Sequence, residues 1–381
     1  MIFPDAMLGM LGGGQLGRMF TLAAHSMGYR VTVLDPDPTS PAGTIADVHL
    51  RAAYQDREAL ERLADTCAAV TTEFENVPAE SLRWLGAYCT VRPTADSVAV
   101  AQDRIREKRF LVENGFAVAP FAAITSAHEC GRADAALFPG ILKRARFGYD
   151  GKGQARVATP EEARAAFVAM GSEPCVLEKH VMLACEVSVV AARGADGATR
   201  SFPVAENSHR NGILDVSIVP ARVERALAQR AEDQAQAVAT RLGYCGVLAV
   251  EFFVTTEGEL LVNEIAPRPH NSGHYTIDAC VTSQFEQQVR TLCGLPLGET
   301  HLIAPAVMVN LLGDVWHGGE PAWDAVFSCP EAKLHLYGKH EARPGRKMGH
   351  YTVLGRDVDA ALSQALAVRA RLSPDFQLQS V

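Results

Sequence analysis

The sequence lacks several features that mark whole classes of protein. Its nine cysteines are odd in number and include no C-x-x-C pair, so neither a zinc ribbon nor a disulfide scaffold is expected, and a reducing, cytoplasmic setting fits better. The longest apolar runs are well short of the ~20 residues that span a bilayer, which argues against a membrane partner. The N-terminus has no basic stretch followed by an apolar one, so we expect no signal peptide.

Positive charge is also scarce. Lys and Arg number 36 against 44 Asp and Glu, which gives a net charge of −8. A nucleic-acid partner is therefore not expected, because phosphate backbones need a basic face, but a small phosphate ligand needs only a few local cations. With 48% hydrophobic and 21% charged residues the chain is globular in composition, and 381 residues suggest two or three domains.

The first hundred residues alternate between strand-like and helix-like patterns. This alternation predicts a parallel sheet with crossover helices. We also expect one long helix over 95–114, with Gly115 as its C-cap. The predicted strands are 7–11, 31–34 and 68–72, and the predicted helices are 15–27, 56–65 and 78–85.

After about Pro120 the pattern predicts an antiparallel α+β region. Thr159-Pro-Glu-Glu is a typical helix start, and a long helix is expected over 224–241. The last stretch, from about Leu302, mixes short strands with a helix near 357–372. The strands expected in the middle region are 140–143, 175–178, 186–192, 201–205 and a hairpin of 247–254 with 259–265.

Gly12-Gly-Gly-Gln-Leu-Gly17 matches G-x-G-x-x-G between a strand and a helix, and Asp35 follows 18 residues after Gly17. Three interpretations stay open: a nicotinamide-dependent dehydrogenase, a loop for another phosphate, and a purely structural turn. Glu73 and Glu75 follow the third strand and share one face. They indicate a polar ligand site at the sheet edge, or else acids that cap a loop.

A second glycine-rich stretch, 142–154, is the stronger signal. Three glycines within six residues let a loop fold closely over phosphates, and Lys143 and Lys152 supply positive charge. The stretch is not a Walker A loop, because Gln154 stands where lysine is required. Lys143 lies inside an apolar strand and should have a partner, for which Glu251 and Glu264 are the candidates through metal and nucleotide.

Glu251 and Glu264 lie on the two strands of the predicted hairpin. Strict alternation places Glu251 opposite Val262, with Glu264 diagonal to it at roughly 7–8 Å on the same face, and Asn263 on the other face unless a bulge intervenes. Two such carboxylates can share Mg²⁺ that also binds phosphate oxygens. The proline-locked segment that follows offers an oxyanion pocket from Arg268, His270 and Asn271.

Taken together, these segments resemble the 5-(carboxyamino)imidazole ribonucleotide synthases, the ATP-grasp carboxylases of de novo purine synthesis. The resemblance runs from about residue 7 to 356. It is carried by Gly12-Gly-Gly-Gln-Leu-Gly-Arg-Met, Thr72-Glu-Phe-Glu-Asn-Val-Pro, Ala101-Gln-Asp-Arg-Ile-Arg-Glu-Lys, Phe147-Gly-Tyr-Asp-Gly-Lys-Gly-Gln, Val250-Glu-Phe-Phe, Asn263-Glu-Ile-Ala-Pro-Arg-Pro-His-Asn-Ser-Gly-His and Arg343-Pro-Gly-Arg-Lys-Met-Gly-His.

The resemblance implies a fold that combines α/β and α+β parts. An N-terminal biotin-carboxylase-like parallel-sheet domain (1–115) would precede a central ATP-grasp domain (116–300) and a small C-terminal β-rich domain (301–381). It also implies a homodimer with ATP and Mg²⁺ as cofactors, which carboxylates the exocyclic amine of aminoimidazole ribonucleotide with bicarbonate. Carboxyphosphate forms first, and either it or the CO₂ that it releases reaches the amine.

The resemblance assigns roles to individual residues. Glu251 and Glu264 would ligate Mg²⁺, and catalysis would involve Arg268, His270, Asn271 and Lys339. The nucleotide would be held by Arg104, Lys143, Gly148, Tyr149, Asp150, Gly151, Lys152, Gly153, Gln154, Glu178, Lys179, His180, Val181, Glu186, His209, Asn263 and Glu264. The ribonucleotide would meet Gln15, Glu73, Glu75, Tyr149, Lys339, Arg346 and Lys347.

Two other ATP-grasp activities remain as alternatives: a formate-dependent glycinamide ribonucleotide transformylase and a biotin carboxylase. The segment 343–350 favours the first choice over both. The nicotinamide dehydrogenase rests only on the first glycine motif and Asp35.

Overall fold

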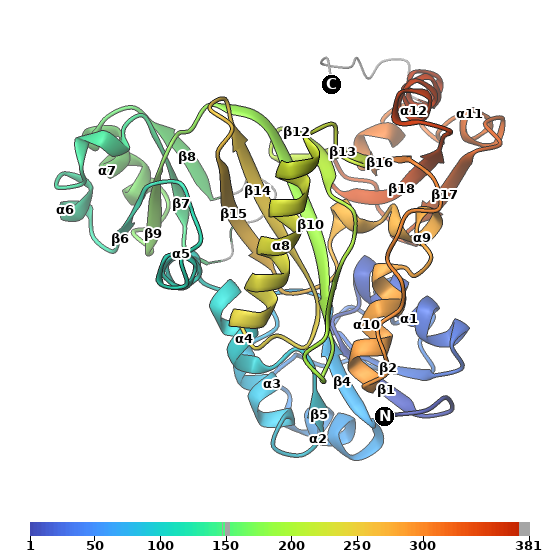
Figure 1. Cartoon of the computed structure of the whole chain (residues 1–381). Helices are drawn as coiled ribbons and strands as arrows, with labels where there is room; N and C mark the ends of the chain where they lie inside the picture. Colours follow the sequence, from blue (N-terminus) through green and yellow to red (C-terminus); the bar gives the residue numbers. More distant parts are fainter. Residues whose placement is uncertain (147, 149–152, 373–381) are drawn as a thin grey trace.

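The computed structural model describes residues 1–146, 148 and 153–372, and its strands form three sheets. A parallel sheet holds the N-terminal segment, a small antiparallel sheet stands to one side, and a large antiparallel sheet lies between them (Figure 1). Within these residues no helix has both the length and the apolar character needed to cross a bilayer.

The N-terminal sheet has the order β3-β2-β1-β4-β5 and every pairing in it is parallel, as the sequence predicted. β1, β2 and β4 are buried almost throughout, which is typical of strands covered on both faces. The elements are β1 (Met7–Leu11), α1 (Gln15–Ser26), β2 (Arg30–Leu34), β3 (Val48–Leu50), α2 (Arg57–Thr66), β4 (Ala69–Thr72), α3 (Ala79–Leu85) and β5 (Thr90–Val91).

The single helix predicted over 95–114 is wrong. The chain forms α4 (Ala95–Ala101) and then a separate helix, α5 (Arg104–Glu113). Asp103 causes the break, since it has extended backbone geometry and its carboxylate accepts the N–H groups of Ile105 and Arg106 as an N-cap. Gly115 has φ +81° just after the helix, as a C-terminal glycine requires.

The small sheet has the order β6-β9-β7-β8. One helix that packs on this sheet is α7 (Pro160–Ala169). Thr159 caps α7 by accepting the Glu162 N–H, and Pro160 occupies its first turn, as predicted. The elements are β6 (Phe121–Ile124), α6 (Ala127–Cys130), η1 (Ala135–Leu137), β7 (Gly140–Arg144), β8 (Gln154–Val157), α7 (Pro160–Ala169) and β9 (Cys175–Lys179).

The large sheet has nine strands in the order β15-β14-β10-β12-β13-β16-β18-β17, with β11 paired to β10. Its elements are β10 (Leu183–Arg193), β11 (Thr199–Ser201), β12 (Ala205–Arg210), β13 (Ile213–Val219), α8 (Arg225–Arg241), β14 (Gly246–Thr255), β15 (Leu260–Ala266), η2 (Asn271–Gly273), α9 (Thr276–Ala279), α10 (Gln284–Cys293), β16 (Ala306–Leu312), η3 (Gly313–Trp316), α11 (Asp324–Phe327), β17 (Ala332–Leu336), β18 (Lys347–Leu354) and α12 (Val358–Leu372).

The hairpin predicted from 247–254 and 259–265 is present as β14 and β15, but the strand predicted over 201–205 is wrong. β11 ends at Ser201 and β12 begins at Ala205. Pro203 lies between them, and because proline has no N–H it cannot continue the ladder.

The two faces of the large sheet differ in chemistry. Alternate residues such as Val187, Val189 and Val250 pack with α8 in an apolar core. The residues between them point to the other face, where polar side chains such as Ser188 and Glu251 lie. Further along this second face, Val190 and Ala249 belong to another apolar core, so the polar residues occupy only part of it.

The C-terminal strands continue the same large sheet, because β16 pairs with β13. α10 packs its apolar side on β1 and α1 of the N-terminal sheet, and Figure 1 shows it beside α1. The division at residues 115 and 300 stays a prediction.

Candidate active site

A cavity of about 750 Å³ lies between the three sheets, and most of the predicted site residues line it. Its volume is in the range of small-molecule sites. The predicted residues on its wall are Gln15, Glu73, Glu75, Arg104, Lys143, Gly148, Gly153, Gln154, Glu178, Lys179, His180, Val181, Glu186, His209, Glu251, Asn263, Glu264, Arg268, His270, Asn271 and Lys347.

Four predicted residues, Tyr149, Asp150, Gly151 and Lys152, lie outside the described residues. Lys339 and Arg346 are not among the residues that line the cavity, and the Arg346 guanidinium donates to the Glu341 carbonyl at 2.9 Å. The Lys339 ammonium donates to Gln15 Oε1 at 2.5 Å and to the Lys347 carbonyl at 2.6 Å, which joins the C-terminal segment to the first glycine loop.

The first glycine loop is bonded by the protein's own carboxylates. Asp35 accepts the Gly13 N–H at 2.7 Å, and Glu73 accepts the N–H groups of Gly14 and of Gly17, the latter at 2.7 Å. Burial raises the pKa of Glu73, while these two N–H groups act in the opposite direction. Because the donors that a pyrophosphate would need are occupied, the loop does not favour a nicotinamide cofactor.

Glu75, two residues further, binds Arg268 from the far side of the cavity. The guanidinium donates from Nε at 2.5 Å and from Nη2 at 3.3 Å. Burial by itself would raise the pKa of Glu75, but Arg268 outweighs it and lowers the pKa to about 2. The pair is thus a charge-assisted contact that orients Arg268 within the cavity.

The sequence predicted Glu251 and Glu264 as the partners of Lys143, but its direct partner is Glu178. Its ammonium donates to Glu178 Oε2 at 2.7 Å, and Lys108 reaches the other oxygen at 3.3 Å. Burial alone would raise the pKa of Glu178, but the two ammonium groups lower it to about 2. β7, β9 and α5 therefore bring two cations together around one carboxylate.

The two predicted metal carboxylates are closer in register than strict alternation allowed. Glu251 lies directly opposite Glu264, and the predicted partner Val262 faces Phe252 instead. A β-bulge between these pairs adds Asn263 to β15, so one strand has one more residue than the other. Directly opposed residues have Cβ atoms about 4.5–5.5 Å apart, so the two carboxylates can reach a common ion.

Two buried residues of α5, missed in the sequence, hold this bulge. β15 is an edge strand, and Lys108 donates to its Asn263 carbonyl at 2.9 Å, while Glu107 accepts its Ile265 N–H at 2.5 Å. Burial, with Glu264 nearby, raises the pKa of Glu107 to about 8. Both residues end the segment Ala101-Gln-Asp-Arg-Ile-Arg-Glu-Lys, but only the packing of α5 against β15 shows what they contact.

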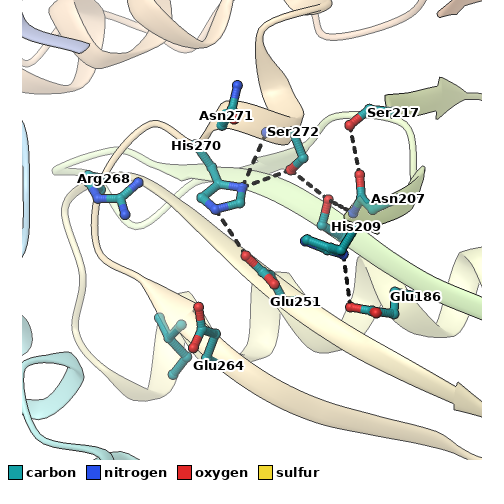
Figure 2. A network of polar contacts seen from close by, with 12 residues as sticks. Glu186, Asn207, His209, Ser217, Glu251, Glu264, Arg268, His270, Asn271 and Ser272 are labelled. Atoms are coloured by element: carbon teal, nitrogen blue, oxygen red, sulfur yellow. Dashed lines mark hydrogen bonds and ion pairs between the residues drawn. The ribbon is translucent and has the colours of Figure 1, made fainter. Parts of the chain in front are cut away.

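Each carboxylate of the pair also meets a cationic or imidazole side chain. Arg104 donates to Glu264 at 2.6 Å, and His270 Nε2 lies 3.0 Å from Glu251 (Figure 2). Burial alone would raise the pKa of Glu251, but His270 contributes most to holding it below its usual range. On the next strands, Glu186 lies 3.2 Å from His209 and helps raise the pKa of that imidazole against the effect of burial.

The donor set fits Mg²⁺ that is completed by substrate. Among the described residues no group of three or more His, Cys, Asp or Glu side chains is arranged to hold a metal ion by itself. Mg²⁺ commonly takes one or two carboxylates and fills its other positions with phosphate oxygens and water. Glu251 and Glu264 meet that requirement.

Asn271 is less available than the sequence suggested. Its side-chain amide exchanges two hydrogen bonds with that of Asn310, at 3.0 and 2.8 Å. The pair ties η2 to β16, so the Asn271 side chain is already engaged on the protein. Its role toward bicarbonate stays a prediction.

Comparison with known proteins covers nearly the whole chain. The ribonucleotide synthetase preATP-grasp domain matches residues 6–102, the ATP-grasp domain 109–285, and the phosphoribosylaminoimidazole carboxylase C-terminal domain 306–364. The N5-carboxyaminoimidazole ribonucleotide synthase of Bacillus subtilis is 46% identical over 359 residues, or 94% of each chain. The chain belongs to the N5-carboxyaminoimidazole ribonucleotide synthase family.

Solved structures of this family agree in fold. A synthetase solved as its ADP complex is 43% identical, with a TM-score of 0.92 over 97% of each chain. The synthase of Aspergillus clavatus, solved with ADP and 5-aminoimidazole ribonucleotide, is 31% identical, with a TM-score of 0.89 over 97% of this chain and 99% of that one. The expected ATP-grasp architecture, with a parallel-sheet domain before it and a further domain after it, is thus confirmed.

Proposed function

We propose that this protein carboxylates the exocyclic amine of 5-aminoimidazole ribonucleotide, using ATP and bicarbonate and releasing ADP and phosphate. The observation that carries the proposal is one cavity in which an opposed carboxylate pair meets the Arg268–His270 segment and the Lys339–Gln15 contact. Family membership over the full architecture supports it.

ATP occupies the side of the cavity between the small and the large sheets. Lys143, whose ammonium is held by Glu178, and Arg104, held by Glu264, face the phosphates from two directions. The remaining nucleotide contacts come from 148–154, 178–181, Glu186, His209 and Asn263. Glu251 and Glu264 would hold Mg²⁺, which would supply positive charge to offset the negative charge that grows on the phosphate oxygens during transfer.

Bicarbonate is a poor electrophile, so it is activated first. Its oxygen attacks the γ-phosphate of ATP, and the product is carboxyphosphate with ADP as the leaving group. Arg268 is placed for this step by Glu75, and it stabilises the charge on the carboxyl group. His270 and Asn271 bound the same part of the cavity.

The ribonucleotide binds between the N-terminal sheet and the C-terminal segment. Gln15, Lys339 and Lys347 come together there, and Lys339 joins them through two hydrogen bonds. Glu73, Glu75, Tyr149 and Arg346 complete the predicted contacts. The amine then captures the carboxyl group from carboxyphosphate or from CO₂ released beside it, and closure around the site keeps water from hydrolysing the intermediate.

The direct test measures ADP formation with ATP, Mg²⁺, bicarbonate and aminoimidazole ribonucleotide. We expect turnover that requires all four, and a product that carries label from ¹³C-bicarbonate on its exocyclic nitrogen. Turnover with formate and glycinamide ribonucleotide, or with biotin, would instead support the alternative ATP-grasp activities.

Arg346→Ala should raise the KM for the ribonucleotide by about 10-fold or more, while the KM for ATP changes little, because a lost charge-assisted contact costs about 1.5–3 kcal/mol. Steady-state kinetics with each substrate varied in turn checks this. The matched control is Arg343→Ala, which removes a 70% exposed guanidinium that pairs with Glu341. Equal rises in both KM values at position 346 would contradict its placement.

The wider setting is part of the same proposal. A homodimer in the cytoplasm, with domain boundaries near residues 115 and 300, fits the family to which the chain belongs. Size-exclusion chromatography with light scattering tests the oligomeric state.

A further inference from the structure

We infer that a chain of buried polar side chains across the large sheet, together with the backbone N–H of Ser272, holds His270 in one tautomer and one orientation. The chain begins at Ser217 on β13, crosses Asn207 on β12 and Ser188 on β10, and ends at Ser272 beside the imidazole. Figure 2 shows it between the strands and the loop that follows β15. These four are positioning residues, since they act on the predicted metal carboxylate only through His270.

All four side chains are buried, so each polar atom needs a partner inside the protein. Three strands adjacent in the sheet supply three of them, and Asn207 and Ser217 are direct cross-strand partners. The contacts are short throughout: 2.8 Å from Ser217 to Asn207, 2.8 Å from Asn207 to Ser188, and 2.7 Å from Ser188 to Ser272.

A single group sets the direction of the whole chain. Hydroxyls, the amide and the imidazole can each donate or accept, but the backbone N–H of Ser272 can only donate, and it points to His270 Nδ1 at 3.3 Å. Nδ1 therefore accepts. The Ser272 hydroxyl, 2.8 Å from the same nitrogen, must also donate to it.

The remaining links then follow in order. Because the Ser272 hydroxyl uses its one O–H to donate a hydrogen bond to His270, its oxygen accepts from the Ser188 hydroxyl. The Ser188 oxygen in turn accepts from the Asn207 amide, whose carbonyl oxygen accepts from Ser217. Each donor in the chain thus has one acceptor, and Nδ1 alone accepts from two donors.

The far side of the imidazole agrees with this direction. The Glu251 carboxylate can only accept, and its 3.0 Å ion-pair contact with Nε2 fits a proton on that nitrogen. Ser188 is also the cross-strand partner of Glu251, which places the carboxylate and the chain that orients its imidazole on one face of the sheet. Partners of this kind behind a metal-binding group fix its orientation.

The functional consequence rests on the proposed function: His270 acts as a hydrogen-bond donor that holds one Glu251 oxygen and leaves the other for the ion shared with Glu264. The tautomer itself does not depend on which reaction the protein catalyses. The inference about the tautomer and the proposed function can therefore fail separately.

The first test measures the tautomer in the wild-type protein. Long-range ¹H–¹⁵N correlation spectra of protein labelled with ¹⁵N-histidine distinguish a proton on Nε2 from one on Nδ1, and the spectrum of His270→Gln identifies the signals of His270. We expect the Nε2–H form. A proton on Nδ1 would overturn the inference, whether or not the protein carboxylates the ribonucleotide.

The second test breaks the chain. Asn207→Asp is nearly isosteric but replaces the donor to Ser188 with an acceptor, so the Ser188 hydroxyl turns toward residue 207 and the Ser272 hydroxyl can donate to Ser188 instead of to His270. The Ser272 backbone N–H still donates to Nδ1, so the Nε2–H form stays, but we expect the Nδ1 signal to shift as the hydroxyl hydrogen bond is lost and kcat to fall about 10–100-fold. An unchanged Nδ1 signal in this variant would show that the chain beyond Ser272 does not act on the imidazole.

A matched pair of variants covers the case in which the new carboxylate at 207 impairs folding. Ser272→Ala removes the hydroxyl that donates to His270, and Ser272→Thr retains it. We expect kcat to fall about 10–100-fold in the first and to recover most of the loss in the second, with the KM for ATP little changed. Equal losses in both would mean that packing at η2, and not the hydroxyl, is what matters.

Discussion

Glu264→Gln is expected to lower kcat for ADP formation by about 100–1000-fold, because removing one preorganised electrostatic contact to a developing charge commonly costs that much. The substitution preserves size but removes one of the two opposed charges that would hold Mg²⁺. Steady-state kinetics across a range of Mg²⁺ concentrations measures the loss. The circular dichroism spectrum should stay that of the wild type, since the Glu264 side chain is 34% exposed to the cavity.

The control for this variant lies on the same hairpin. Glu257→Gln changes an exposed acid in the turn that joins β14 to β15, far from Arg104 and from the bulge. It should retain wild-type turnover. If Glu264→Gln also turned over ATP normally, the carboxylate pair would not be the metal site, even though the cavity and the fold stay as described.

Arg369→Met is expected to destabilise the protein by about 3–5 kcal/mol, because it leaves a buried charge without its partner. Arg369 on α12 donates to both oxygens of Asp215 on β13, at 2.8 and 2.6 Å, and both side chains are at most 10% exposed. This ion pair ties the last helix to a strand of the large sheet. Denaturant-induced unfolding followed by circular dichroism measures the loss.

Arg371→Met is the matched control two residues later on the same helix. Arg371 meets Asp324 at 3.8 Å, with the two side chains 57% and 83% exposed. Exposed pairs contribute about 0–1 kcal/mol, so this variant should unfold close to the wild-type midpoint. Similar losses in both variants would mean that α12 depends on its arginines in general, not on the buried pair.

Local signals in the sequence predicted most of the fold because they act over few residues. The parallel arrangement of β1, β2 and β4 follows from alternating periodicity, and the start of α7 follows from its capping residues. The break before α5 was missed, although Asp103 is itself a good cap, because the apolar pattern on both sides reads as continuous. Periodicity alone does not distinguish one long helix from two shorter ones, and the tertiary structure shows that there are two.

The sequence by itself determined the family and the set of candidate residues, because carboxylates, glycine loops and the Arg-Pro-His segment are local patterns that spacing and family resemblance identify. Only the tertiary structure decided how they meet. The bulge at Asn263 depends on Lys108 and Glu107, more than 150 positions away, and the donor to Ser188 comes from another strand. Register and hydrogen-bond direction arise from contacts between distant segments, and a linear pattern does not contain them.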